Sequence, residues 1–278
     1  MTRFSPILLL LAGALCQAQP VPLIDQAFDR MYRHNFSGAQ EVIAQHIAAH
    51  PDDPLGYAVK AAAYLFYELD RLQILESEFF NDDKRILDKK KAVPDPKVKE
   101  GVMQNIEKTK SISNALLAKD ANHREALLSL CMALGVQTDY LALIEKRQLG
   151  SLSYAKESQS WAVKLLKVDP NYYDAYLTTG VSEYLMGSMP FFVKWFVKFE
   201  QTQGSKTEAV KNLTLVAQKG RYFRPFAKVL LSVIHLREKR PLDAEILLGE
   251  LNREFPENPL FRKELAKLQA RRKVSAGE

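Results

Sequence analysis

Short turns that contain proline divide this chain into stretches in which apolar residues recur three and four positions apart. That spacing is typical of one face of an α-helix, and no long stretch alternates apolar and polar residues as a half-buried strand does. Each turn carries residues that end one helix and begin the next. The clearest turns lie at residues 51–54, 169–171 and 256–259. The pattern predicts an all-α fold of successive helices.

The composition is that of an ordinary folded protein and excludes several other classes. Of 278 residues, 47% are apolar and 26% are charged, which excludes a chain that is disordered throughout. Two cysteines are too few for a scaffold held by disulfides. The 39 Lys and Arg against 33 Asp and Glu give a net charge of +6, which is too small to indicate a nucleic-acid-binding protein. We therefore expect no nucleic-acid partner.

The first eighteen residues have the pattern of a secretory signal peptide. Arg3 is the only charged residue among the first 24, and an apolar run follows at residues 7–15. This run is too short to span a bilayer, which takes about 20 residues, and small residues follow it. Cleavage after Ala18 predicts a mature chain that begins at Gln19 and is exported, to the periplasm or beyond. The alternative is a lipid anchor on Cys16, which the bulky preceding residue disfavours. No later stretch reaches 18 apolar residues, so we expect no other membrane span.

The segment from residue 169 to residue 187 carries a more specific set of residues. They are Asp169, Pro170, Asn171, Ala175, Tyr176, Gly180, Tyr184 and Gly187. This set resembles the junction between two tetratricopeptide repeats (TPR), in which Asp-Pro-Asn ends one helix pair and alanine with an aromatic residue opens the next. Two helices that cross closely need a small residue at the crossing, and Gly180 occupies that place with Tyr176 beside it.

Small residues recur along the chain at the position that Gly180 occupies in its helix pair. They are Ala27, Ala61, Cys131, Gly180 and Ser232, and the first two are 34 residues apart, which is the TPR repeat length. The wider gaps after them predict three insertions. These are expected near residues 71–105, 136–150 and 188–204. Two positions depart from the family pattern, because Lys228 stands where an aromatic residue is usual and Ala121 where proline is usual.

The resemblance implies an all-α fold: a right-handed α-solenoid of about five TPR-like helix pairs with a capping helix at its C-terminal end. The pairs are expected at residues 22–50, 54–120, 123–169, 171–220 and 222–256, and the capping helix at 259–273. Together they form a single TPR-like domain over residues 19–278. The last helix has an apolar side and a basic remainder, as a solenoid end exposed to water requires.

No group of residues predicts catalysis, a cofactor or a metal. His46 and His50 have a spacing that can chelate a metal, but they lack the adjacent glutamate of a zinc protease. We interpret them as part of a solvated helix face. Four carboxylates at residues 76–83 have no regular ligand spacing and are interpreted as charged surface. Cys131 lies in an apolar helical stretch without a neighbouring cation, which predicts a buried and unreactive thiol. We expect no enzyme and no cofactor.

Residues 189–199 form a stretch rich in aromatic residues, and Phe192, Trp195 and Phe196 are its candidate contact residues. Three interpretations stay open. The stretch extends the core, it fills the inner surface of the solenoid, or it contacts a membrane surface, where Trp and Lys are favoured. Positive charge also gathers near the C-terminus, since residues 201–278 hold 16 Lys and Arg against nine Asp and Glu. That charge suits an acidic partner or an anionic lipid surface, or it is an ordinary solvated face.

The predicted function is a scaffold that binds a protein or peptide partner in the cell envelope. Stacked helix pairs expose the first helix of each pair on an inner surface, and the phase set by Gly180 predicts which residues line it. They are Ala62, Phe66, Leu128, Met132, Leu177, Val181, Tyr184, Val229 and Val233. This groove is apolar, so it suits an extended or helical apolar peptide, or a segment of the chain itself fills it. The alternatives are a structural subunit of an envelope complex and a protein that contacts a membrane surface through residues 189–199.

Overall fold

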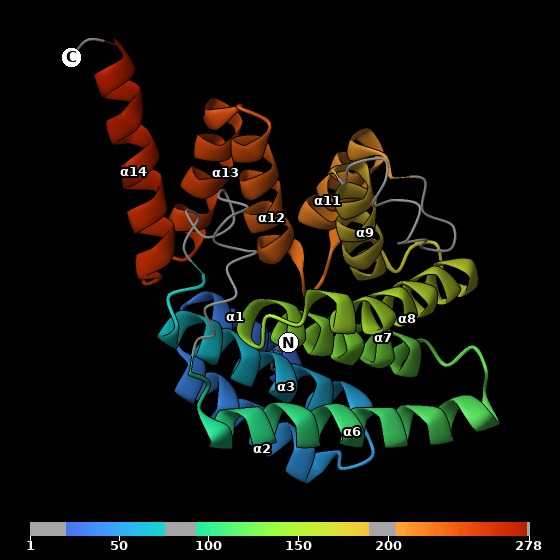
Figure 1. Ribbon diagram of the computed structural model, residues 1–278. Helices are drawn as coiled ribbons and strands as arrows, with labels where there is room; N and C mark the ends of the chain where they lie inside the picture. Colours follow the sequence, from blue (N-terminus) through green and yellow to red (C-terminus); the bar gives the residue numbers. More distant parts are fainter. Residues whose placement is uncertain (1–20, 76–92, 189–203, 277–278) are drawn as a thin grey trace, which may run out of the picture.

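The computed structural model describes residues 21–75, 93–188 and 204–276, and Figure 1 shows their arrangement. The predicted signal peptide, the carboxylates at residues 76–83 and the aromatic residues Phe192, Trp195 and Phe196 lie outside these residues. The described residues form α-helices joined by short turns, with no strand among them. This confirms the predicted all-α class.

Eleven α-helices are present in the described part of the chain. They are α1 (Leu23–Tyr32), α2 (Phe36–Ala49), α3 (Pro54–Arg71), α6 (Pro96–Lys119), α7 (Arg124–Asp139), α8 (Gln148–Val168), α9 (Tyr176–Ser188), α11 (Lys206–Lys219), α12 (Arg224–Arg237), α13 (Pro241–Glu254) and α14 (Pro259–Ala276). A π-helical turn at Tyr140–Ile144 continues α7, and a 3-10 turn at Tyr173–Ala175 precedes α9. Proline lies in the first turn of α3, α6, α12 and α13. A backbone N–H in that turn has no hydrogen-bond acceptor within the helix, so proline, which has no N–H, is well tolerated there.

The helices pack as five successive pairs followed by a single helix. The pairs are α1 with α2, α3 with α6, α7 with α8, α9 with α11, and α12 with α13, and α14 then packs on α13. These are the five pairs and the final helix that the sequence predicts. The third and fourth pairs meet where α8 contacts α9 and the 3-10 turn before it.

Two of the expected insertions are smaller than the sequence suggests. Helix α6 begins at Pro96, so residues 96–105 belong to the second helix of a pair instead of an insertion. Between residues 136 and 150 the chain is helical as α7, the π-turn and the start of α8, except for a short turn at residues 145–147. The third pair is therefore enlarged chiefly by longer helices. The third expected insertion lies almost wholly outside the described residues.

The small residues lie where helices cross, as predicted. Ala27, Ala61, Cys131, Gly180 and Ser232 are all buried. Gly180 has the clearest reason to be glycine, since a Cβ there would stand 2.9 Å from the Leu213 Cγ and 3.3 Å from the Ala209 carbonyl oxygen of α11. Two tyrosines mark the same point in different repeats. The Tyr57 hydroxyl donates to the Pro51 carbonyl at 3.1 Å, and the Tyr176 hydroxyl donates to the Pro170 carbonyl at 3.2 Å.

The departure at Lys228 has a structural explanation. Its ammonium group lies 2.8 Å from the Glu250 carboxylate of α13, and its side chain is mostly buried. An ion pair thus links the two helices of the fifth pair where other repeats place an aromatic ring.

Helix α7 is the described segment that could cross a membrane by length and composition alone. Within residues 124–144, a window of 18 residues has a mean hydropathy of 1.6, although it contains no uninterrupted apolar run of that length. In the structure 61% of this window is buried, and α7 packs against α3, α6 and α8. Its apolar surface is thereby explained as that of a core helix.

Candidate protein-binding surface

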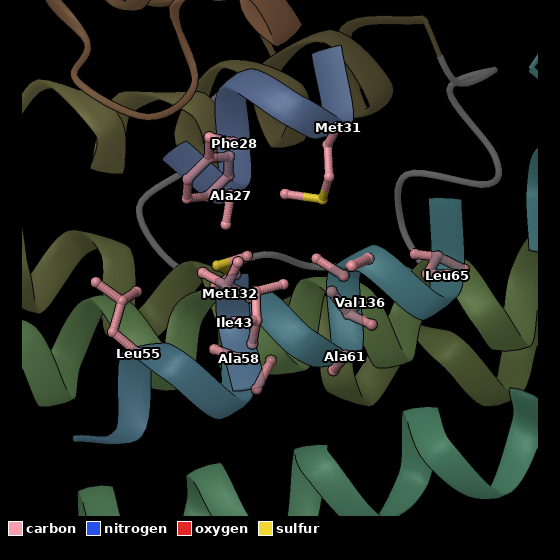
Figure 2. Close-up of a cluster of buried hydrophobic side chains, with 14 of the residues drawn as sticks. Ala27, Phe28, Met31, Ile43, Leu55, Ala58, Ala61, Leu65, Met132 and Val136 are labelled. Carbon is pink, nitrogen blue, oxygen red and sulfur yellow. The ribbon is translucent and has the colours of Figure 1, made fainter. Parts of the chain in front are cut away.

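The first half of the predicted inner groove is filled. Ala62, Leu128 and Met132 are only 2%, 1% and 9% exposed, so they lie in the core and no partner can reach them. Phe66 is partly buried, and its ring meets that of Phe226 from α12 at 5.4 Å. Figure 2 shows Ala27 pointing from α1 toward Met132 and its neighbours. Of the two alternatives, a groove open to a partner and a groove filled by the chain itself, the second holds along this half, where Ala27 of α1 packs toward Met132.

Helix α1 is held in that position by turns far along the chain. The Phe28 ring stacks on Tyr222 at 5.1 Å, and the Tyr32 hydroxyl donates to the Tyr222 carbonyl at 2.8 Å. Ion pairs flank the contact, with Arg221 to Asp25 at 2.7 Å and Arg33 to Glu257 at 2.9 Å. The Asn258 amide donates to the Tyr32 carbonyl at 2.9 Å. The first pair therefore packs on its own neighbour and also on the turns before α12 and α14.

A buried aspartate shapes the turn that carries Tyr222. The Asp174 carboxylate accepts hydrogen bonds from the backbone N–H groups of Arg221, Tyr222 and Phe223, at 3.0, 3.0 and 2.8 Å. Burial raises the pKa of Asp174, while the three N–H donors act in the opposite direction. The carboxylate satisfies three backbone donors at the start of α12, so the aromatic residues after it hold a fixed position against α1.

The second half of the predicted groove is only partly open. Leu177, Val181 and Val233 are partly exposed on the first helices of the last two pairs. Tyr184 is 9% exposed, and its hydroxyl donates to Glu238 at 3.3 Å. Val229 packs toward the cluster formed by α13 and α14. The structure therefore leaves a short apolar strip here instead of a groove that runs the length of the molecule.

A different hollow lies on the outer side of the last two pairs. It has a volume of about 430 Å³, with α12 as its floor and α11 and α13 as its walls. Its lining residues are Thr214, Ala217, Gln218, Lys228, Leu231, His235, Asp243, Ile246, Leu247 and Glu250. A second hollow of about 550 Å³ runs from α11 toward Tyr176. Thr214 and Gln218 of α11 line both hollows, so the two hollows are neighbours on either side of these residues, and we call them together the outer groove.

The outer groove combines exposed apolar residues with fixed polar groups. Leu242 and Ile246, one turn apart on α13, are 59% and 61% exposed, and Ile246 lines the groove. The Lys228–Glu250 ion pair crosses the groove floor. Burial lowers the pKa of the neighbouring His235, with a smaller contribution from Arg240. Apolar anchors beside paired polar groups are typical of surfaces that bind polypeptides.

Sequence reasoning missed this groove because it assigned function to the first helix of each pair. The available signal lay in α13, which carries two apolar stripes. One stripe contains Ala244, Leu248 and Leu251 and is buried in the core, whereas Leu242 and Ile246 form the second stripe. A helix that packs on one side needs only the first stripe.

The chemical candidates from the sequence have ordinary partners in the structure. The His46 Nε2 atom lies 2.7 Å from the Asp53 carboxylate, so His46 is paired and mostly buried instead of solvated, while His50 is exposed. Within the described residues no group of three His, Cys, Asp or Glu could hold a metal ion. The Cys131 thiol is buried beside the Thr178 hydroxyl at 3.1 Å, and burial raises its pKa.

The helix pairs define the chain as an all-α helical-repeat protein with TPR-like pairs. No family model matches the chain, and no curated protein matches it either. Among solved structures it is similar to the crystal structure of a thermophilic TPR protein of Thermus thermophilus, with a TM-score of 0.47 and 14% identity. That match covers 88% of this chain and 99% of the other.

Proposed function

We propose that this protein is a non-enzymatic scaffold that binds a polypeptide partner through the outer groove. The observation that carries the proposal is the pair of exposed apolar residues, Leu242 and Ile246, beside the outer groove, whose lining includes the Lys228–Glu250 ion pair. Exposed leucine and isoleucine one turn apart gain free energy when a partner covers them, at roughly 25 cal/mol per Å² of apolar surface.

The shape of the groove suits a helical segment. Its walls, α11 and α13, both pack on α12, and the space between them lies over Leu231. An amphipathic helix that presents apolar residues three and four positions apart can meet Ile246 and Leu247 of α13 along one face. Polar groups on the same helix can then meet Gln218 and Asp243 at the rim. We therefore propose an amphipathic peptide as the ligand class.

We also propose that the protein is exported and works in the cell envelope. Support comes from the sequence alone: the basic start, the short apolar run and the small residues that end at Ala18. Expression in a bacterial host followed by fractionation and N-terminal sequencing tests this part. We expect a chain that begins near Gln19 in the periplasmic or extracellular fraction. A cytoplasmic chain that retains Met1 would refute it.

Selection of peptides from a displayed random library tests the proposed groove. We expect enriched peptides with an amphipathic helical pattern, and fluorescence anisotropy then gives their Kd. Ile246→Asp should weaken binding at least tenfold, since a charge on an apolar anchor is left desolvated. The matched control is Leu149→Asp on α8, where the leucine is 84% exposed and far from the groove in sequence. Equal effects of the two substitutions, or an absence of enriched peptides, would contradict the proposal.

A further inference from the structure

The last helix, α14, presents a basic face that the outer groove does not use. Its 18 residues contain six Lys and Arg and one acidic residue, Glu264. Glu264 is buried on the inner side, where it lies 2.9 Å from the Lys267 ammonium group. Arg272 is exposed, and its guanidinium group lies 3.3 Å from the Glu245 carboxylate of α13.

The outer face of α14 is exposed along its length and carries no acidic residue within the described part of the chain. Its exposed residues are Arg262, Lys263, Ala266, Gln269, Ala270, Arg271, Lys273 and Val274. They recur three and four positions apart opposite the buried residues Phe261 and Leu268, so they form one face of the helix. Small residues, Ala266 and Ala270, occupy the middle of that face, and basic residues flank them.

The shape of this face indicates what kind of partner it fits. Helix α14 lies at the edge of the array beyond α13 (Figure 1), and it is about 27 Å long at 1.5 Å per residue. The outer groove is lined by residues between 176 and 250, with none from α14. A straight, convex, basic helix offers a folded ligand no concave site, but it can lie along a flat anionic surface. Ala266 and Ala270 let the helix axis approach such a surface while the flanking basic side chains extend to it.

We propose that the outer face of α14 binds an anionic phospholipid surface. The contact is electrostatic, between Lys and Arg side chains and lipid phosphates, because Val274 is the one large apolar side chain on the described part of the face. The surface lies on a different helix from the outer groove, so the protein can hold a membrane and a peptide at the same time. The proposal is independent of the peptide-binding function.

Sedimentation of the full chain with large unilamellar vesicles tests this proposal. The probes are vesicles with 30% phosphatidylglycerol in phosphatidylcholine, and vesicles of phosphatidylcholine alone. The test variant combines Arg262→Gln, Lys263→Gln and Lys273→Gln. The matched control removes three exposed lysines from other helices, Lys97→Gln, Lys119→Gln and Lys167→Gln, and so has the same net charge. All three proteins share residues 1–20, so any contribution of that segment to vesicle binding is common to them.

We expect binding to the anionic vesicles at 50 mM salt, little binding to phosphatidylcholine, and loss of binding at 500 mM salt. The α14 variant should bind the anionic vesicles at least tenfold more weakly, and on the order of a hundredfold for three basic groups at the surface. The control variant should keep most of the binding. Circular dichroism and thermal melting should be the same for all three proteins, since the changed residues are exposed.

Three results would overturn the proposal. The first is an absence of binding to anionic vesicles at low salt. The second is an equal loss in the α14 variant and the control, which would show a response to net charge alone. The third is tight binding of polyglutamate that competes with the vesicles and depends on α14, which would assign the face to an acidic polypeptide.

Discussion

The crossing of α9 and α11 at Gly180 allows a sharp test of the repeat packing. A Cβ at residue 180 would lie 2.9 Å from the Leu213 Cγ, 3.1 Å from its Cδ2 and 3.3 Å from the Ala209 carbonyl oxygen. Leu213 is fully buried, and the Ala209 contact is with backbone, so neither neighbour can move freely. Overpacking of this kind costs about 1–3 kcal/mol. The gain in helix propensity from glycine to alanine, about 0.5–1 kcal/mol, offsets part of it.

Gly180→Ala should therefore lower the free energy of unfolding by up to about 2 kcal/mol, and Gly180→Leu by more. The chain provides a matched control in Gly249, which also lies within a helix, and a Cβ added there would meet no neighbouring group within 4 Å. Gly249→Ala keeps the propensity gain without the steric cost, so it should stabilise the protein by about 0.5–1 kcal/mol. Urea denaturation followed by circular dichroism at 222 nm measures both variants. If the two alanine variants shift the midpoint in the same direction and by the same amount, the close crossing is refuted.

Three further predictions concern buried polar groups. The Cys131 thiol should not react with Ellman's reagent in the native protein at pH 8, because it is buried and burial raises its pKa. It should react fully in guanidinium chloride, and rapid labelling of the native protein would contradict the prediction. Asp174→Asn should destabilise the protein by about 1–3 kcal/mol in urea denaturation, since one amide oxygen cannot replace two carboxylate oxygens that serve three N–H donors; an unchanged midpoint contradicts this. Burial lowers the pKa of His235, so the folded state favours neutral imidazole and stability should fall as the pH drops below 6.5, the value for an unperturbed histidine. The loss of stability at low pH should be smaller in the His235→Gln variant, and identical stability profiles of the variant and the unchanged protein would contradict the prediction.

The helix pairs could be predicted because their signals are local. Proline turns, apolar spacing and one small residue per crossing act within a single pair, and the hydrogen bonds of Tyr57 and Tyr176 repeat the same local geometry. The packing of α6 was harder to foresee. A Cβ at Gly101 would stand 2.8 Å from the Tyr64 ring, and no repeat spacing marks that contact. The same limit applies at Glu68, a buried carboxylate that pairs with Arg71 and accepts from the Asp95 backbone N–H at 2.7 Å.

The candidate surfaces could be predicted only in part, because they depend on contacts between distant repeats. The sequence identified Leu177, Val181 and Val233 as inner residues, and they are partly exposed on helices of the last two pairs. It also placed Leu128 and Met132 on the same inner surface, although both side chains are buried in the core. Nothing in the spacing of the repeats indicates that the first helix meets turns about 190 to 230 residues further along the chain.

The position of α1 changes how the array holds together. In an open solenoid each repeat contacts only its neighbours, so stability is a sum of local terms and the ends can unfold separately. Here the junction between α8 and α9 is bridged by α1, whose Phe28 and Tyr32 contact the turn at Tyr222. The same turn is held by Asp174, which lies in that junction. The first and last pairs are thus coupled through the contacts of Phe28 and Tyr32 with the turn at Tyr222, so a perturbation of that turn should loosen α1 as well as α12.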